Sequence, residues 1–237
     1  MSVTLTSVER INALKNGIES ITGETYADLT EGVQALKNGY NPNGNSEFVS
    51  IIQERLYDNS KGACSVFSGW QLPESYIALF DFSKVESFVT TFYANRVIKN
   101  LTIDTQSAKN IQQICSACVE LETVVFSDTS KVVTWNTPFS VCRKLKSIKT
   151  LDFSNVTTVT NPFVGCDIVE ELLFVPETIK VSIAIPSPFL NTESKQSIID
   201  GLAYVTTTKT LTVDADAGFT EEQKATAKSK GWTVVEN

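Results

Sequence analysis

A seven-residue step recurs four times in the middle of the chain and constrains its fold more than any other feature. Each copy has an apolar residue or cysteine, an asparagine or cysteine three positions later, and an aliphatic residue three positions after that. Successive copies begin 23, 24 and 24 residues apart. The copies are Phe92-x-x-Asn95-x-x-Ile98, Cys115-x-x-Cys118-x-x-Leu121, Phe139-x-x-Cys142-x-x-Leu145 and Phe163-x-x-Cys166-x-x-Val169. Such a period predicts an array of similar units that bury their apolar faces against one another.

Each unit continues into a short segment in which apolar and polar residues alternate. This period of two is typical of a strand with one buried face. We expect strands at residues 77–82, 100–104, 123–127, 150–154 and 171–175. The inward residues would be Phe80, Phe82, Leu101, Ile103, Val124, Phe126, Leu151, Phe153, Leu172 and Phe174. Extra residues between Leu145 and Leu151 set the third unit apart from the others.

The motif Cys115-Ser-Ala-Cys118 also has the spacing of a redox pair or of half a zinc site. A zinc site needs further ligands nearby, and a redox pair needs an exposed, electropositive setting. In the alignment, however, Cys115 takes the place of Phe92, and Cys118 takes the place of Asn95. We therefore predict no metal site and no cofactor. The residues interpreted as the core of the repeat are Asn95, Cys118, Cys142 and Cys166.

A period in the low to middle twenties, with alternating strands and an Asn or Cys step, resembles a leucine-rich repeat. The F-x-x-C-x-x-L spacing and the irregular units of about 21–27 residues are similar to the BspA-like subclass, known from Gram-positive gut bacteria and their prophages. The resemblance covers roughly residues 64–185, with Val, Ile or Phe often in place of Leu. It implies an α/β fold, namely a leucine-rich-repeat solenoid with a helical N-terminal segment and an α/β C-terminal cap.

The sequences on either side of the repeat divide the chain into further parts. Residues 1–40 carry apolar stripes at helical spacing, which indicate either a hairpin that packs on itself or an element for oligomerisation or attachment. The expected parts are a helical segment at 1–40, a linker at 41–47, an N-terminal cap at 48–75, the repeats at 76–190 and a C-terminal cap at 191–237. Both caps would cover an apolar end of the array.

The expected C-terminal cap combines helices and strands. We predict helices at 192–205 and 220–231, the second opening at Thr220, and strands at "KTLTVD" and "WTVVE". A T-E-E-Q helix followed by K-G-W-T resembles the ends of leucine-rich proteins carried by phages and prophages of Gram-positive bacteria.

Composition excludes several classes of function. The chain has no histidine, which removes Ser-His and Cys-His nucleophilic pairs and histidine-containing zinc sites. It has no P-loop, nucleophile-elbow or dinucleotide motif, so we predict no catalytic residue. A net charge of −7 argues against nucleic acid as a partner. No segment is apolar enough to span a membrane, and no signal peptide is evident, so we expect synthesis in the cytoplasm, with display at the cell surface only if a leader was removed.

These observations lead to two functional hypotheses. The first is a non-enzymatic module that binds a protein or glycan surface through the outward residues of its strands. That face would carry Asp81, Thr102, Asp104, Val125, Ser127, Asp152 and Ser154, with Leu173 at one end. The alternative is a virion-associated structural component of a phage or prophage tail or baseplate, whose solenoid faces the host while residues 1–40 anchor or trimerise the chain.

Overall fold

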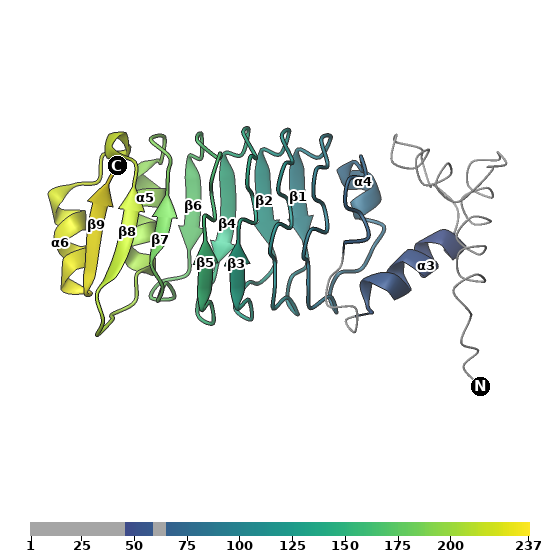
Figure 1. Cartoon of the computed structure of the whole chain (residues 1–237), viewed down its shortest axis with the longest axis horizontal. Helices are drawn as coiled ribbons and strands as arrows, with labels where there is room; N and C mark the ends of the chain where they lie inside the picture. The colour runs from purple at the N-terminus through teal and green to yellow at the C-terminus, as the bar shows by residue number, and fades with distance from the viewer. Residues whose placement is uncertain (1–45, 59–64) are drawn as a thin grey trace.

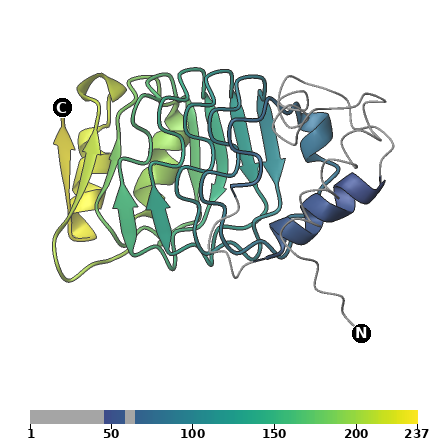
Figure 2. The same cartoon turned by 45° about the vertical axis from the view of Figure 1, so that its right-hand side comes forward.

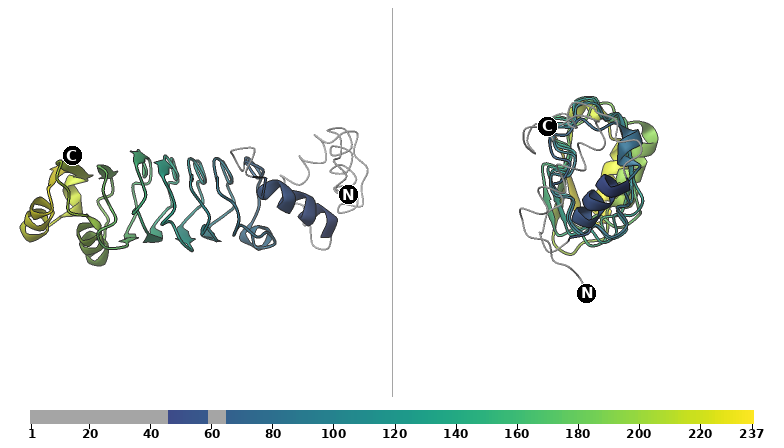
Figure 3. Two further views of the ribbon diagram at one scale, coloured as in Figure 1. Left: turned by 90° about the horizontal axis from the view of Figure 1, so that it is seen from below. Right: turned by 90° about the vertical axis from the view of Figure 1, so that its right-hand side faces the viewer.

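The repeated step builds a stack of similar chain turns in the computed structural model, which describes residues 46–58 and 65–237. The turns follow one another along the long axis of the molecule, and seen end-on they superpose as a flattened ring (Figures 1 and 3). The fold is mixed α/β with parallel sheets, as expected. The predictions for residues 1–40 lie outside the described residues, as does the expected linker apart from Ser46 and Glu47, which begin helix α3.

One column of strands forms a parallel sheet in the order β1-β2-β4-β6. Its members are β1 (Asn100–Ile103), β2 (Thr123–Phe126), β4 (Ser147–Leu151) and β6 (Glu171–Phe174). Exposure alternates along β1, β2 and β6, so three of the five expected strands are confirmed. All ten residues predicted to point inward are buried. The period of two therefore identified the core side of this sheet correctly.

The strand expected at 77–82 is wrong. Helix α4 (Glu74–Ile77) begins after Pro73, and no strand follows it, although Phe80 and Phe82 are still buried. The physical reason lies in the edge of the sheet, where the Glu74 carboxylate accepts the N–H groups of Lys99 and Asn100 at 2.7 and 2.8 Å. A side chain thus satisfies backbone groups that a preceding strand would otherwise have paired.

The strand expected at 150–154 is displaced toward the N-terminus. β4 runs from Ser147 to Leu151, and its pairing with β6 is irregular between Ile148 and Leu151. Thr150 adopts a left-handed conformation with φ of 63°. The extra residues of this unit thus form a bulge, which lets both Ile148 and Leu151 point inward and leaves Asp152 beyond the end of the strand.

A second column of short strands was missed from the sequence. It contains β3 (Thr134–Asn136) and β5 (Thr158–Thr160), which pair with each other, and then the sheet β7-β8-β9. The members of that sheet are β7 (Ile183–Ile185), β8 (Lys209–Val213) and β9 (Trp232–Glu236). The β3 and β5 strands lie on the other side of the ring from β1, β2, β4 and β6 (Figure 2). Three-residue strands are too short to show a period of two.

The Asn or Cys step links each turn to the one before it. The thiols of Cys118, Cys142 and Cys166 donate to the carbonyls of Phe92, Cys115 and Phe139 at 3.0–3.1 Å. The amide of Asn95 instead donates to the Leu72 carbonyl at 2.7 Å, and its oxygen accepts the N–H groups of Val97 and Ile98 at 3.0 and 3.2 Å. All four step residues are buried.

The thiols of the step are held in their protonated form. Burial raises the pKa of Cys115 well above its ordinary value, with a further contribution from Cys118. A hydrogen bond with Cys166 raises the pKa of Cys142, and burial raises it further. Nucleophilic attack and metal binding both need the thiolate, so these environments favour packing over chemistry.

Helices occupy both ends of the stack. At one end lie α3 (Ser46–Leu56) and α4, and at the other lie α5 (Thr192–Gly201) and α6 (Glu221–Ser229), with β8 and β9 (Figure 1). The expected C-terminal helices and strands are confirmed, although α5 ends at Gly201 rather than 205. A side chain at Gly201 would come within 2.9 Å of the Phe174 Cβ atom, so this glycine lets the helix lie close to β6.

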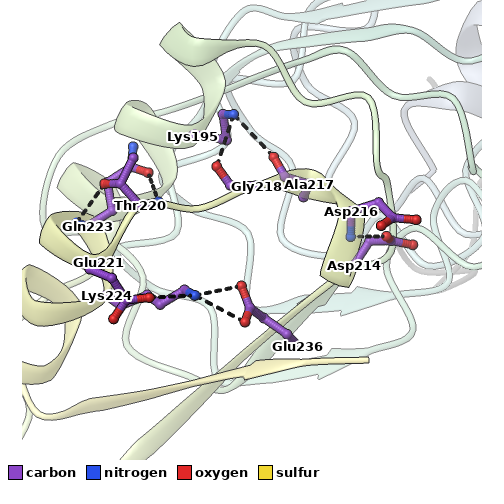
Figure 4. A network of polar contacts seen from close by, with 10 residues as sticks. All are labelled: Lys195, Asp214, Asp216, Ala217, Gly218, Thr220, Glu221, Gln223, Lys224 and Glu236. Atoms are coloured by element: carbon purple, nitrogen blue, oxygen red, sulfur yellow. Dashed lines mark hydrogen bonds and ion pairs between the residues drawn. The ribbon is translucent and has the colours of Figure 1, made fainter.

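Polar contacts join the parts of the C-terminal cap to one another (Figure 4). Thr220 and Gln223 form a capping box at the start of α6, as Thr220 was expected to do. Lys195 of α5 donates to the carbonyls of Ala217 and Gly218, and Lys224 of α6 pairs with Glu236 of β9. Among the described residues, no helix is both long and apolar enough to cross a membrane.

Candidate functional site

The outward side chains of β1, β2, β4 and β6 form a continuous surface, which we call the strand face. Because the strands are parallel and in register, equivalent side chains lie in rows across the sheet. One row contains Thr102, Val125 and Lys149, which are direct neighbours on β1, β2 and β4. The next contains Asn100, Thr123, Ser147 and Glu171. The strand face is thus a surface of hydroxyl, amide and charged groups.

Hydrogen bonds order the second row. The Thr123 hydroxyl donates to the Asn100 side-chain oxygen at 2.7 Å, and the Ser147 hydroxyl donates to Glu171 at 2.5 Å. Glu171 also pairs with Lys149 at 3.2 Å. The Ser147 bond lowers the pKa of Glu171, partial burial raises it, and Lys149 lowers it, with a net decrease. Glu171 is therefore a fixed negative charge at neutral pH, positioned before any ligand arrives.

A row of aspartates borders the strand face but belongs to the turns that follow the strands. Each carboxylate accepts the N–H of the residue two positions later, at 2.7–2.9 Å, which is the geometry of an Asx turn. The members are Asp81, Asp104, Asp128 and Asp152. Their first role is to form the turn, which leaves only the remaining carboxylate oxygens for a ligand.

The strand face ends at a step where α5 replaces the next strand. A hollow of about 630 Å³ lies in the angle between β6 and α5. Its floor is formed by Leu173, Phe174 and Pro176, and the helix contributes Glu193 and Gln196 among other polar residues. The step joins an apolar floor to an acidic wall, which is a suitable shape for a ligand group that is apolar on one side and polar on the other.

Both free edges of the sheet are covered by side chains. Glu74 accepts the N–H groups at the β1 edge, as described above. At the other edge, the N–H groups of Leu172 and Phe174 donate to the hydroxyls of Ser194 and Ser197 on α5, each at 2.8 Å. These contacts satisfy edge groups that would otherwise be open to another strand, so the face rather than the edge of this sheet is the surface for binding.

The structure separates the seven residues predicted for the binding face into two groups. Thr102 and Val125 lie on the strand face, and Leu173 forms part of the step. The residues that lie after the strands or in turns are Asp81, Asp104, Ser127, Asp152 and Ser154. Their placement on the strands is wrong, because the strands end earlier than expected.

Other members of the site were missed from the sequence. Lys149 was missed because the bulge in β4 shifts the alternation by one residue. Asp128 was missed because the units differ in length, so Ser127 was aligned with Asp104 in its place, whereas the Ser127 hydroxyl in fact donates to Asp104 at 2.8 Å. The recurring Asp-x-Ser at Asp81, Asp128 and Asp152 is the signal that would have corrected the alignment.

Residues 46–58 and 65–237 contain no group of three or more cysteine, aspartate or glutamate side chains arranged to hold a metal ion. Comparison with known proteins does not add to the description of the site. No protein-family model matches the chain, and no curated protein and no solved structure matches it.

Proposed function

We propose that the protein is a non-enzymatic binding module, built on an irregular BspA-like leucine-rich-repeat solenoid, that holds a protein or glycan surface against its strand face. The observation that carries the proposal is the ordered row of Asn100, Thr123, Ser147 and Glu171 beside the row of Thr102, Val125 and Lys149. The stacking of units 23 or 24 residues long supports the solenoid.

The chemistry of the strand face supports this class of ligand. Hydroxyl, amide and carboxylate groups both donate and accept hydrogen bonds, as sugar hydroxyls and peptide surfaces require. The row is held by its own hydrogen bonds, so a ligand would not have to order these side chains on binding. The step beside α5 adds an apolar floor at Leu173, which suits the apolar face of a sugar ring or an aliphatic side chain.

A screen followed by paired substitutions tests the proposal. The labelled full chain is applied to an array of bacterial and eukaryotic glycans and to a display library of extracellular protein domains, and each hit is then titrated against two variants. Val125→Arg places a long charged side chain on the strand face. Val133→Arg places the same side chain next to β3, on the other side of the molecule, where Val133 is already exposed.

The two variants separate a role of the strand face from a general effect of the substitution. Val125→Arg should weaken binding by about tenfold or more, because it obstructs the middle of the interface. Val133→Arg should leave the affinity unchanged. Equal losses in both variants, or no ligand in either screen, would contradict the proposal.

A further inference from the structure

The second column of strands is interrupted between β5 and β7. Its pairing runs through single bridges of Ser87, Asn110 and Thr134 into the β3–β5 sheet, and it resumes at β7 and continues through β8 to β9. Thr158 and Ile183 are 25 residues apart, which is close to one unit. β7 thus occupies the next position after β5, yet within the described chain no hydrogen bonds pair the two strands.

The interruption coincides with a change in the first column from strands to helices, since α5 follows β6 there (Figure 1). A helix with its side chains is about 10 Å across, whereas paired strands lie about 4.8 Å apart. A helix in one column therefore spaces the C-terminal turns more widely than the turns before them. The second column cannot keep its hydrogen bonds across this change in spacing.

The break leaves backbone groups of β5 directed away from β3. The Thr158 N–H donates to the Val133 carbonyl, and the Thr160 carbonyl accepts the Thr137 N–H, so both threonines face β3. Because successive residues of a strand direct their backbone groups to opposite sides, the N–H and carbonyl of Val159 face the break.

The loop after β5 continues this set of open donors. In earlier turns, the N–H of Ala117 donates to the Ser140 carbonyl, and that of Val141 donates to the Val164 carbonyl, each in the next turn. Gly165 occupies the same position one turn later, but in residues 65–237 no acceptor faces its N–H. The loop therefore has lost the same type of contact as the strand.

β7 presents matching groups from the other side. On β8, Lys209 donates to the Gly231 carbonyl, and Val213 accepts the Asn237 N–H, so both residues face β9. The residues between them alternate toward β7, and the register of β7 on β8 then directs the N–H and carbonyl of Ala184 away from β8 and toward β5. Val159 and Ala184 thus offer one donor and one acceptor each from opposite sides of the break.

A groove follows the break along the surface. It consists of two adjoining hollows of about 260 and 330 Å³, which share Asn161, Ala184 and Thr212. The part beside the strands is lined by small or hydroxyl-bearing residues such as Thr160 and Ser182. The part beyond the C-terminal ends of the strands is lined by Phe163, Val164, Asp167 and Asp214, among others. We call the two hollows together the β5–β7 groove.

We propose that the β5–β7 groove binds an extended peptide segment of another protein, which adds a strand at the break and carries a basic residue toward its C-terminal end. The backbone groups of Val159 and Ala184 would pair with the peptide, as in other cases of strand addition to open edges. A parallel orientation continues the column and places the C-terminal end of the peptide beside Asp167 and Asp214, which supply the charge complementarity. The site is on the other sheet from the strand face, so either proposal can fail without the other.

The probe is a synthetic peptide whose sequence follows that of the strand that would fill the break. Acetyl-Thr-Val-Thr-Val-Thr-Lys-amide repeats the Thr-Val-Thr of β5 and ends in one lysine. A second peptide has lysine at its N-terminal end, and a third has N-methyl groups on alternate amides, which removes backbone donors. Binding to the full chain is measured by fluorescence anisotropy and by NMR shifts and hydrogen exchange of the Val159 and Ala184 amides.

Two proline variants distinguish the groove from the remaining free edge of the same sheet. Ala184→Pro removes an N–H that faces the groove and that pairs with no other strand. Val234→Pro removes an N–H that faces outward from the opposite edge, because the neighbouring residues of β9 pair with β8. Proline is tolerated at such outward-facing edge positions.

The proposal predicts a specific pattern of affinities. The first peptide should bind and protect both amides, and Ala184→Pro should weaken it about tenfold, the equivalent of one lost hydrogen bond, while Val234→Pro should not. N-methylation should weaken binding at least as much, and this comparison does not depend on whether a variant folds. Moving the lysine should weaken binding about two- to fivefold, since an exposed ion pair contributes little.

Three outcomes would overturn the proposal. The first is no binding of the first peptide at millimolar concentration. The second is equal binding of the first and the N-methylated peptides. The third is self-association of the full chain, measured by light scattering, that Ala184→Pro abolishes, because the occupant of the groove would then be a second copy of this protein.

Discussion

Replacement of Asn95 by alanine should destabilise the protein far more than replacement of Cys142 by alanine, although both residues occupy the same step of the repeat. Asn95 is 1% exposed and makes three hydrogen bonds, to the Leu72 carbonyl and to the N–H groups of Val97 and Ile98. Alanine removes all three. The carbonyl and the two N–H groups then have no other hydrogen-bond partner among the described residues.

The magnitude follows from which of these groups water can reach. Val97 is 41% exposed, so its N–H can find water, whereas Ile98 is fully buried and Leu72 is 4% exposed. Two buried unpaired groups at about 1–3 kcal/mol each give a loss of about 2–5 kcal/mol for Asn95→Ala. In Cys142→Ala, the Cys115 carbonyl keeps its bond from the Cys118 N–H at 3.1 Å. The loss is then a small volume and one weak bond, about 1–2 kcal/mol.

The free energy of unfolding is measured by urea denaturation, followed by tryptophan fluorescence, because Trp135 and Trp232 are buried and report on the middle and the C-terminal end of the stack. The slope of the free energy against urea must be the same in all variants for the comparison to hold. If Asn95→Ala is no less stable than Cys142→Ala, then the assignment of the Asn95 side chain as a bonded bridge between turns is wrong.

Three further predictions concern stability. Val141 has φ of 64°, which is strained for a β-branched residue, so Val141→Gly should stabilise the protein by about 0.5–1 kcal/mol in thermal unfolding. The matched change Gly165→Ala, at φ of 71° and 3.2 Å from the Val141 Cα atom, should destabilise it, and the same sign in both variants would refute the strain. Although partial burial of Glu74 raises its pKa, hydrogen bonds from the N–H groups that it accepts lower it further, so its contribution is complete above pH 4.5 and is lost as the pH falls below that value. The stability of Glu74→Gln should therefore fall less steeply than that of the native protein below pH 4.5 in acid titrations of unfolding, and parallel curves would exclude this role. The buried Lys230 ammonium donates to three carbonyls at the end of α5 at 2.9–3.1 Å, so Lys230→Met should lower the urea midpoint by the equivalent of about 2–4 kcal/mol, and an unchanged midpoint would contradict it.

The seven-residue step shows how far a sequence can be interpreted without coordinates. Phe92, Phe139 and Phe163 recur at a constant spacing, and all are buried, because a repeated unit must bury the same positions in each copy. The same reasoning failed at Asp152. One left-handed residue, Thr150, changes which side chains point outward, and nothing in the local pattern of polar and apolar residues indicates it.

The sequence by itself determined which residues form the core of the stack, since hydrophobic burial depends on periodicity and periodicity is visible in one dimension. It also determined the mixed α/β class and the elements of the C-terminal cap, because helices such as α6 carry their start signals locally. Only the tertiary structure decided the second column of strands, whose members β3 and β5 exist because neighbouring turns supply their hydrogen bonds. It also decided the break between β5 and β7, because that break depends on the different widths of a helix and a strand in adjacent turns, a property of packing that no single segment contains.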